Sequence, residues 1–385
     1  MNNLTTNNNF PDIISHFKTD EGTYNVKPFG SGHINDTFIA RHTQNPASVY
    51  LLQKINHFVF KDIAGLMGNM ISVTNHLKSK IAKLPGGSPN KEVLTLIEGR
   101  DGKYYYADED SNYWRMTSFL ENTRSYDLVT TGQQAYQGGM AFGRFQCLLS
   151  DLNPDSIVDT IPNFLNIEKR LIDFDNAINN DRVGRLKAAL FEVEFLSSRA
   201  IGMKDILRLG NAGILPLRIT HNDTKFNNIL LDENNEVQCV IDLDTVMPGY
   251  VAYDFGDAIR TIINTAMEDE PNLDAIQLNI PLFTGFTRGY LNQTHSFLTE
   301  AELGSLMSGV LLMPYMQSIR FLTDYLEGDV YYKTSSIEHN LQRAKAQMQL
   351  FKLLEDNKKR LTDIVNNEWL HLKNNLHPEG TSFGK

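Results

Sequence analysis

The chain has 385 residues, of which 41% are hydrophobic, and it carries a formal charge of −10. A single hydrophobic core rarely extends beyond roughly 250–300 residues, so this length predicts two lobes. The charge is negative and no block of Lys or Arg occurs, which argues against nucleic acid or an anionic membrane as the main partner. Small molecules and metal ions remain as partners.

The cysteines and the hydropathy of the chain indicate in which cellular compartment the protein is expected. Cys147 and Cys239 are far apart in sequence and lie among apolar neighbours, which predicts buried, unpaired thiols in a reducing cytosol. No run of about 18 apolar residues occurs, and the start, MNNLTTNNNF, lacks the basic and apolar parts of a signal peptide. We therefore expect a soluble, cytoplasmic protein, without a prediction of its oligomeric state.

Residues 1–120 are predicted to form a lobe around an antiparallel sheet. The first nine residues are rich in Asn and Thr and are expected to be disordered. A short amphipathic helix over 10–17 follows, and a longer helical pattern covers 62–81. Alternating apolar residues predict strands on both sides of Gly30 and Gly32, and further strands over 48–56, 92–99, 103–108 and 113–120.

Residues 121–385 are predicted to form a larger, mostly helical lobe. The exception is the stretch 217–247, where two apolar runs flank the turn ENNE and predict a hairpin. Each long apolar pattern around this stretch is read as one helix; these patterns cover 133–152, 167–200, 298–326 and 340–372. The fold class is therefore α+β.

The segment THNDTKFNNILLD, residues 220–232, carries the strongest chemical signal. Transfer of a phosphoryl group to a hydroxyl needs a carboxylate that accepts the proton, oxygen ligands for magnesium and a backbone cradle for the phosphates. The spacing H-x-D-x-x-x-x-N makes Asp223 the candidate base and Asn228 a candidate magnesium ligand. Asp242, at the end of the following strand, is the second ligand, and Lys225 is placed to neutralise the transferred phosphoryl group.

An ordinary turn is the alternative interpretation of this loop, because Asn and Asp in turns often bond their own backbone. The order of glycine turn, loop, hairpin and strand end favours phosphoryl transfer. Gly30 and Gly32 let backbone N–H groups approach phosphate oxygens, although an ordinary hairpin also uses glycines. Lys54 on the next strand is a candidate phosphate contact, with a solvated lysine as the alternative.

Seven segments together resemble the protein-kinase-like superfamily in its small-molecule branch, the aminoglycoside phosphotransferase and choline kinase group, with N-acetylhexosamine 1-kinases closest. They extend over about residues 28–350 and read LLQKINHFVFKD, YWRMTSFLENTRSYD, AFGRFQ, TIPNFLNIEKR, THNDTKFNNILLD, VIDLDTVMPGYVAYDFGDAIR and RFLTDYLEGDVYYK. IDLDTVMPG joined to YDFGDAIR is the most specific. The resemblance implies a bilobal kinase that uses ATP and Mg²⁺ to phosphorylate the anomeric hydroxyl of free N-acetylglucosamine or N-acetylgalactosamine.

The resemblance also implies roles for individual residues. Backbone groups from Phe119 to Glu121 hold the adenine at the hinge, and Asp254 with Asp257 brace the catalytic loop. The residues implied to meet the sugar are Arg320, Asp324, Tyr325 and, as a further contact, Asp244. For Arg320 the alternative is an ion pair with Asp324 at helical spacing.

Two departures from the family pattern stand out. Between Lys61 and Lys80 the only acid is Asp62, so the usual ion pair between a strand lysine and a helix glutamate lacks its acid. Leu165 occupies a position where relatives have His, which bears on sugar specificity. An aminoglycoside, an amino alcohol such as choline or a different sugar therefore remains an alternative acceptor, and a nucleotide-binding pseudokinase is an alternative of another class.

Overall fold

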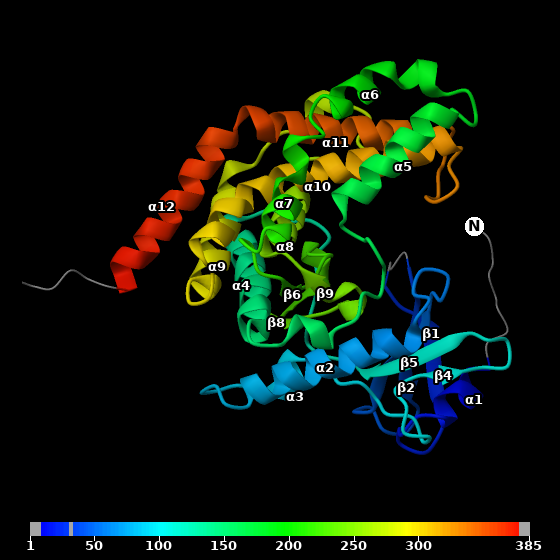
Figure 1. The fold of residues 1–385 in the computed structure, drawn as a ribbon. Coiled ribbons are helices and arrows are strands. Elements are labelled where there is room, and N and C mark those ends of the chain that lie inside the picture. The colour runs from blue at the N-terminus through cyan, green and yellow to red at the C-terminus, as the bar shows by residue number, and fades with distance from the viewer. Residues whose placement is uncertain (1–8, 31–33, 377–385) are drawn as a thin grey trace, which may run out of the picture. The chain divides into compact units, whose positions relative to one another are not determined.

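The structure is a computed structural model that describes residues 9–30 and 34–376. Its contacts divide the chain into two compact units (Figure 1). The N-terminal unit comprises Met1–Thr123 together with two short later segments, Ser156–Pro162 and Ile241–Thr245, and the C-terminal unit comprises the rest. The predicted boundary at residue 120 did not include these two segments. Among the described residues, no helix is long and apolar enough to cross a membrane.

The N-terminal unit is built on a five-stranded antiparallel sheet with the strand order β1-β2-β3-β5-β4. Its strands are β1 (Tyr24–Pro28), β2 (Asp36–His42), β3 (Val49–Ile55), β4 (Tyr106–Ala107) and β5 (Tyr113–Ser118). β3 lies at the centre, where Leu52 pairs with Phe38 of β2 and with Met116 of β5. The antiparallel sheet agrees with the predicted fold class.

Helices pack on the two faces of this sheet. α1 (Phe10–Ser15) contributes Ile13 and Ile14 to an apolar cluster with Leu52 and Trp114. α2 (Ile63–Ile81) contacts the opposite face, where the sulfur of its Met70 accepts a hydrogen bond of 3.0 Å from Arg115 of β5. α2 begins at the N-cap Asp62, whose side chain accepts from the Gly65 N–H, and it is followed by the short α3 (Pro89–Glu92).

The strand predicted over 92–99 is not formed. The segment bonds to the sheet only at separate points, including Ile97 N–H to Met116 O at 2.9 Å and Ser118 N–H to Thr95 O at 2.9 Å. α3 occupies the start of the predicted range, and the strand predicted over 103–108 is reduced to β4. The adjacent Val93 and Leu94 of this segment are buried, but its pairing consists of isolated bridges and does not make a strand.

The C-terminal unit is mostly helical, as predicted, with two small β-ribbons. β6 (Arg218–Thr220) pairs with β9 (Met247–Gly249), and β7 (Ile229–Leu231) pairs with β8 (Val237–Val240) as the predicted hairpin. Short 3-10 turns occur at Pro154–Ser156, Leu186–Ala189, Gly202–Lys204, Phe226–Asn228 and Leu273–Ala275. The helices are α4 (Gly132–Leu149), α5 (Ile167–Asn180), α6 (Leu190–Ser197), α7 (Asp205–Asn211), α8 (Val251–Ile262), α9 (Ile280–Thr294), α10 (Glu300–Glu327), α11 (His339–Asp356) and α12 (Lys358–Leu376).

Two close helix crossings set the core of this unit. A Cβ at Gly139 of α4 would lie 2.1 Å from the Phe286 carbonyl oxygen of α9, and one at Gly256 of α8 would lie 2.3 Å from the backbone of Gly309 in α10. Only glycine permits this approach. The crossings join α4 to α9 and α8 to α10, and α4 and α8 in turn contact β6, the strand that leads into the candidate loop (Figure 1).

Two of the long helices predicted in this unit are each broken in two. The pattern over 167–200 is interrupted after α5 by Asp181, which caps the helix in the left-handed conformation with φ 34°. The pattern over 340–372 is divided between α11 and α12 at Asn357, the C-cap of α11. Cys239 is buried as predicted, whereas Cys147 is only partly buried and lies 3.7 Å from the Ser296 hydroxyl.

Candidate active site

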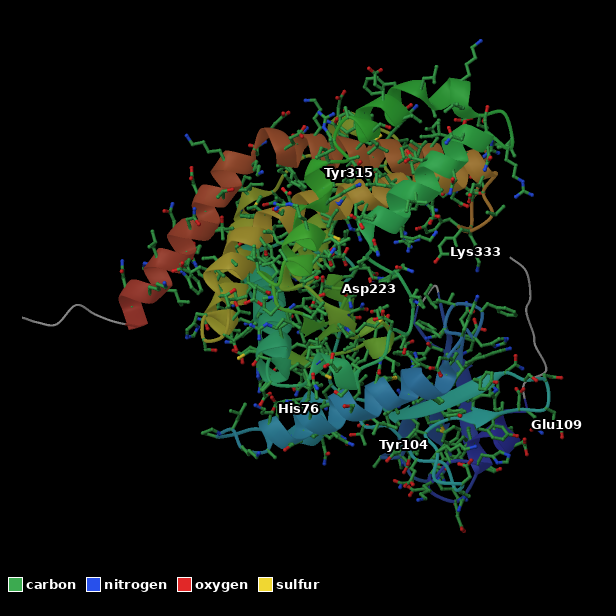
Figure 2. The ribbon with its side chains drawn as sticks, viewed as in Figure 1. His76, Tyr104, Glu109, Asp223, Tyr315 and Lys333 are labelled. Atoms are coloured by element: carbon green, nitrogen blue, oxygen red, sulfur yellow. The ribbon has the colours of Figure 1, made fainter. Side chains whose placement is uncertain are left out.

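The candidate catalytic loop connects the two β-ribbons of the C-terminal unit. It leaves β6 at Thr220 and reaches β7 through a 3-10 turn at Phe226–Asn228. Thr220 donates its hydroxyl to the Met247 carbonyl at 3.1 Å, which ties the start of the loop to β9. Figure 2 marks Asp223, the candidate base, within this unit.

Asp254 on α8 holds the backbone at the start of the loop. Its carboxylate accepts the N–H groups of His221 at 2.8 Å and of Asn222 at 2.7 Å. Asn222 has a positive φ of 63°, a conformation that is costly for a residue other than glycine. The two hydrogen bonds stabilise this turn of the backbone immediately before Asp223.

Asp254 is itself part of a buried polar chain. Gln146 of α4 donates to its carboxylate at 2.7 Å, and the Tyr290 hydroxyl of α9 donates to Gln146. Burial raises the pKa of the Asp254 carboxyl, while the neighbouring His221 and the three N–H donors act in the opposite direction. Side chains from α4 and α9 thus hold Asp254, which in turn holds the loop.

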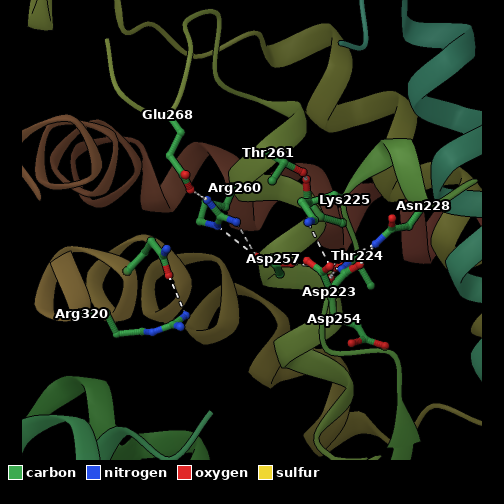
Figure 3. A network of polar contacts seen from close by, with 12 residues as sticks. Asp223, Thr224, Lys225, Asn228, Asp254, Asp257, Arg260, Thr261, Glu268 and Arg320 are labelled. Atoms are coloured by element: carbon green, nitrogen blue, oxygen red, sulfur yellow. Dashed lines mark hydrogen bonds and ion pairs between the residues drawn. The ribbon is translucent and has the colours of Figure 1, made fainter. Parts of the chain in front are cut away.

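Asp257, one turn further along α8, holds the next part of the loop. It accepts the Thr224 N–H at 3.1 Å and forms an ion pair with Arg260 at 2.9 Å. Arg260 also pairs with Glu268 at 2.9 Å, which extends the network away from the loop (Figure 3). The expected bracing contacts of Asp254 and Asp257 with the loop are therefore present in the structure.

Asp223 lies between the two polar side chains that were predicted with it. Asn228 donates its amide N–H to the Asp223 carbonyl at 2.8 Å and to the carboxylate at 3.2 Å. The Lys225 ammonium lies 3.0 Å from the same carboxylate (Figure 3). The Asp223 side chain is 25% exposed, so a substrate hydroxyl has access to its oxygens. Asp223, Lys225 and Asn228 thus form one cluster.

Asp242 and Asp244 belong to the segment Ile241–Thr245 of the N-terminal unit, and they differ sharply in exposure to solvent. Asp242 is exposed and has a positive φ of 61°, which marks a backbone turn at the candidate metal ligand. Asp244 is buried; its carboxylate pairs with Arg115 and accepts from Asn35 at 2.6 Å. With both oxygens engaged inside the unit, the side chain of Asp244 is not available as the expected sugar contact.

The glycine turn and the hinge come together in the N-terminal unit. Phe29, next to Gly30, lies edge-to-face against Phe119 with ring centroids 5.6 Å apart. Arg41 lies 5.7 Å over the Phe119 ring and 4.0 Å from the Glu121 carboxylate. Gly30 has a φ of 76° with open space at its Cβ position, which suits both an ordinary turn and a phosphate-facing one, and Gly32 lies outside the described residues.

Lys54 is on the opposite face of the sheet from the segment that carries Asp242. Side chains alternate along β3, and Lys54 shares a face with Leu52 and lies 6.0 Å from the ring of Trp114 on the α1 side. Gln53 faces the α2 side and accepts from Arg115 at 2.9 Å. The prediction that Lys54 contacts the phosphates therefore has no support in this geometry, because Gln53 and Arg115 occupy the face toward Asp242.

The predicted sugar residues on α10 have separate surroundings. Arg320 donates to Gln317 at 3.0 Å, so the alternative ion pair with Asp324 is not formed. Asp324 is buried and accepts the N–H groups of Tyr331 and Tyr332, and Tyr325 is buried beneath the Arg185 guanidinium, 4.8 Å from its ring centroid. Asp324 and Tyr325 thus act inside the fold, and of the three only Arg320 is partly exposed.

Four side chains near these positions were not predicted as functional. Gln53 and Arg115 are on the α2 side of the sheet, and Arg170 and Tyr332 are beside Arg320. Gln53 adjoins the predicted Lys54, and both Arg170 and Tyr332 occur inside segments that carry the family resemblance. Their places next to a predicted residue or inside these segments were the only hint in the sequence, since the residue types alone do not point to a function.

Comparison with known proteins identifies the family. Residues 25–289 match the model of the phosphotransferase enzyme family. The fold resembles an aminoglycoside phosphotransferase from Alicyclobacillus acidocaldarius, with a TM-score of 0.63 and 12% identity over 92% of this chain and 96% of that one. It also resembles a choline kinase from Cryptosporidium parvum, with a TM-score of 0.52 and 15% identity over 91% and 95% of the two chains.

A third solved structure, a spectinomycin phosphotransferase in complex with ADP and spectinomycin, has a TM-score of 0.52 and 12% identity over 93% of this chain and 96% of that one. At these identities the three structures support the fold, and the family model supports the membership. The antiparallel sheet of the N-terminal unit and the helical C-terminal unit agree with this fold. The chain therefore belongs to the phosphotransferase enzyme family and has its kinase-like fold.

Proposed function

We propose that this phosphotransferase transfers the terminal phosphoryl group of ATP to the anomeric hydroxyl of a free N-acetylhexosamine. The observation that carries the proposal is the accessible carboxylate of Asp223 on a loop whose backbone is fixed by buried Asp254 and by Asp257. A fixed carboxylate within reach of a hydroxyl accepts its proton as the oxygen attacks phosphorus. Lys225, 3.0 Å away, offsets negative charge on the transferred group.

The proposal includes ATP, since a structural neighbour contains ADP. It also includes Mg²⁺, which the oxygen-bearing side chains of Asn228 and Asp242 suit. The amide nitrogen of Asn228 is engaged with Asp223, so its oxygen is the atom left for a cation, and Asp242 presents an exposed carboxylate. When bound, Mg²⁺ would offset charge on the phosphate oxygens. Within the described residues no group of three or more His, Cys, Asp or Glu forms a metal site.

The charge around Arg320 supports a sugar over a cationic acceptor such as an aminoglycoside or choline. The family resemblance implies that the acceptor binds near Arg320, whose guanidinium is positively charged. The nearest acid on the same helix, Asp324, is engaged by backbone N–H groups. A cationic acceptor would be repelled there. A neutral or anionic sugar would instead receive hydrogen bonds from the guanidinium.

Release of ADP from the purified chain with ATP and Mg²⁺ tests this proposal. The panel comprises N-acetylglucosamine, N-acetylgalactosamine, glucose, galactose, choline and kanamycin, and phosphorus NMR locates the phosphate in the product. Turnover restricted to N-acetylhexosamines with a 1-phosphate product is expected. Turnover with choline or kanamycin alone would replace the sugar assignment, and nucleotide binding without any turnover would favour a regulatory pseudokinase.

A further inference from the structure

Two arginine side chains that have no acidic partner among the described residues lie where α5 and α10 pack together. Arg170 of α5 donates to the Phe164 carbonyl at 3.0 Å, and Arg320 of α10 lies 5.8 Å over the ring of the same Phe164. Arg320 also lies 5.7 Å over the ring of Tyr332, which follows α10. We call Arg170, Arg320 and Tyr332 the arginine cluster.

Neither guanidinium of the arginine cluster has a carboxylate within 4.0 Å in the part of the chain that the structure describes. The nearby acids are engaged elsewhere: Asp173 pairs with Lys169, and Glu268 pairs with Arg260. The Nε of Arg170 and the hydroxyl of Tyr332 are buried and have no hydrogen-bond partner among the residues that the structure describes. A buried polar group without a partner costs about 1–3 kcal/mol, so these donors suit a ligand that satisfies them.

The positions of these groups are fixed by structure around them. Asp324 accepts the N–H groups of Tyr331 at 2.8 Å and Tyr332 at 2.9 Å, and Asn340 donates to Asp324 at 2.8 Å. The ring of Tyr332 packs on Phe321, with ring centroids 4.8 Å apart. The hydroxyl is therefore held in place before any ligand arrives, which lowers the entropic cost of binding.

Electrostatics favours a negative ligand at the arginine cluster. Burial lowers the pKa of Arg170, and repulsion from Arg320 lowers it further. Burial raises the pKa of Tyr332, which keeps its hydroxyl protonated as a donor. An oxyanion placed between the two guanidinium groups would relieve their repulsion and accept charge-assisted hydrogen bonds.

The arginine cluster is connected to the catalytic loop through the C-terminal unit. Tyr332 is close enough to Glu268 to be influenced by its charge, and Glu268 ends the chain of contacts that runs through Arg260 and Asp257 to Thr224, next to Asp223. In Figure 3 the guanidinium of Arg320 points from α10 toward the side of the view that holds Asp257 and Asp223. Asp223 and the arginine cluster are thus both in the C-terminal unit.

We propose that Arg170, Arg320 and the Tyr332 hydroxyl bind an anionic group, a carboxylate or a phosphate ester, that the acceptor sugar carries away from its reacting hydroxyl. This inference rests on the proposed function and narrows it: the acceptor is an acidic derivative of an N-acetylhexosamine. The alternative source of the same chemistry is a free inorganic anion that binds beside a neutral sugar.

Matched pairs of sugars test the inference, with kcat/KM measured for each. The pairs are N-acetylglucosamine with its 6-phosphate, N-acetylglucosamine with N-acetylmuramic acid, and glucose with glucuronic acid. At least one acidic member is expected to exceed its neutral partner by about tenfold or more, as charge-assisted hydrogen bonds provide. Calorimetry of the same sugars and of inorganic phosphate, without nucleotide, gives a readout that does not depend on turnover.

Three variants assign the effect to residues. Arg170→Gln, Arg320→Gln and Tyr332→Phe are each expected to reduce the acidic-over-neutral preference, with ADP affinity by calorimetry showing that the variants are folded. Arg208→Gln is the matched control, because Arg208 is exposed on α7 and pairs with Asp205 in the same helix. This control is expected to keep the preference of the unaltered chain.

The outcomes separate the inference from the proposed function. Turnover of neutral and acidic sugars at equal rates, unchanged in all three variants, would overturn the inference and leave the sugar kinase intact. Phosphate binding that depends on the arginines, without preference for an acidic sugar, would overturn the acceptor assignment in favour of a free anion. If no sugar turns over, the proposed function fails, while arginine-dependent binding of an acidic sugar in calorimetry would still support the arginine cluster as its site.

Discussion

Arg115 and Asp244 form an ion pair inside the N-terminal unit although 129 positions separate them, and neither side chain is more than 3% exposed. The guanidinium also donates to Gln53 at 2.9 Å, and the carboxylate also accepts from Asn35 at 2.6 Å. Because Asp242 is two residues from Asp244, the pair fixes the segment that carries the candidate metal ligand to β5. The N-terminal unit thus contains a buried ion pair even though α2 offers no glutamate.

Removal of one partner of this pair is expected to destabilise the chain strongly. Asp244→Asn leaves the Arg115 charge buried without its counterion, which costs about 3–5 kcal/mol. The double variant Arg115→Met/Asp244→Leu leaves no unpaired charge and is expected to lose less than the sum of the single variants. Urea unfolding measures all three. A normal unfolding curve for Asp244→Asn, with only a raised KM for the sugar, would restore the substrate role that the sequence suggested.

Asp223→Asn is expected to fold normally and to lose about 10²–10⁴-fold in kcat, since the amide accepts no proton. The substitution keeps the shape of the side chain, and the anchoring bonds from Asp254 and Asp257 do not involve it. ADP release and thermal unfolding check the two halves of this expectation. Asp356→Asn is the matched control, because Asp356 pairs with Lys352 at 2.9 Å on the exposed side of α11. Full activity of Asp223→Asn would remove Asp223 from the base role.

Asp242→Ala is expected to weaken the response to Mg²⁺ together with the rate. The exposed carboxylate on a left-handed backbone is the feature that suits a metal ligand. A titration of activity against Mg²⁺ should shift to higher concentration by about tenfold or more, as for loss of one charged ligand. Asp110→Ala, a change at another exposed aspartate of the N-terminal unit, is the control. An unchanged titration would exclude Asp242 as a ligand.

Much of the architecture was predictable because its signals are local. Strand alternation gave β1, β2, β3 and β5, and the turn ENNE between two apolar runs gave the β7–β8 hairpin. The polar spacing of the loop predicted that Asp223, Lys225 and Asn228 lie together, since they fall within six consecutive residues of one loop. The helix break at Asp181 was missed because an aspartate in left-handed conformation has no strong signature in sequence.

The errors in the site come from contacts that are distant in sequence. Period-two alternation places Gln53 and Lys54 on opposite faces of β3, but it does not say which face meets α2 and Asp242. The partner of Asp244 is on another strand, so its burial had no local signal. Asp324 likewise gave no sign that its carboxylate would bond the backbone of Tyr331 and Tyr332.

Variants of Lys54 and Gln53, which lie on opposite faces of β3, test which face of the strand meets ATP. Lys54→Met is expected to change the KM for ATP by less than about threefold, because Lys54 lies on the α1 side beside Trp114. Gln53→Leu is expected to raise the KM for ATP more than Lys54→Met does. That change removes the hydrogen-bond acceptor that orients Arg115 on the face toward Asp242. Steady-state kinetics with varied ATP measures both. The reverse order would mean that Lys54 reaches the phosphates after all.

Buried tyrosines predict how stability responds to alkaline pH. Burial raises the pKa of Tyr253, of Tyr290 and of Tyr315. A folded-state pKa above the unfolded value near 10 gives stability that is fully present below about pH 10 and is lost as the pH rises toward the folded value. Each such group should lower the free energy of unfolding by about 1.4 kcal/mol per pH unit above about pH 10.

The Tyr315 hydroxyl, which donates to the Leu196 carbonyl at 2.7 Å, provides the variant for this measurement. Tyr315→Phe is expected to cost about 1 kcal/mol at neutral pH through the lost hydrogen bond, and to reduce the alkaline slope because one phenol is removed. Urea unfolding between pH values of about 8 and 12 measures both effects. Tyr331→Phe, a change at a side chain that is 65% exposed, is the matched control for loss of a phenol. An unaltered slope in Tyr315→Phe would show that this hydroxyl titrates without unfolding.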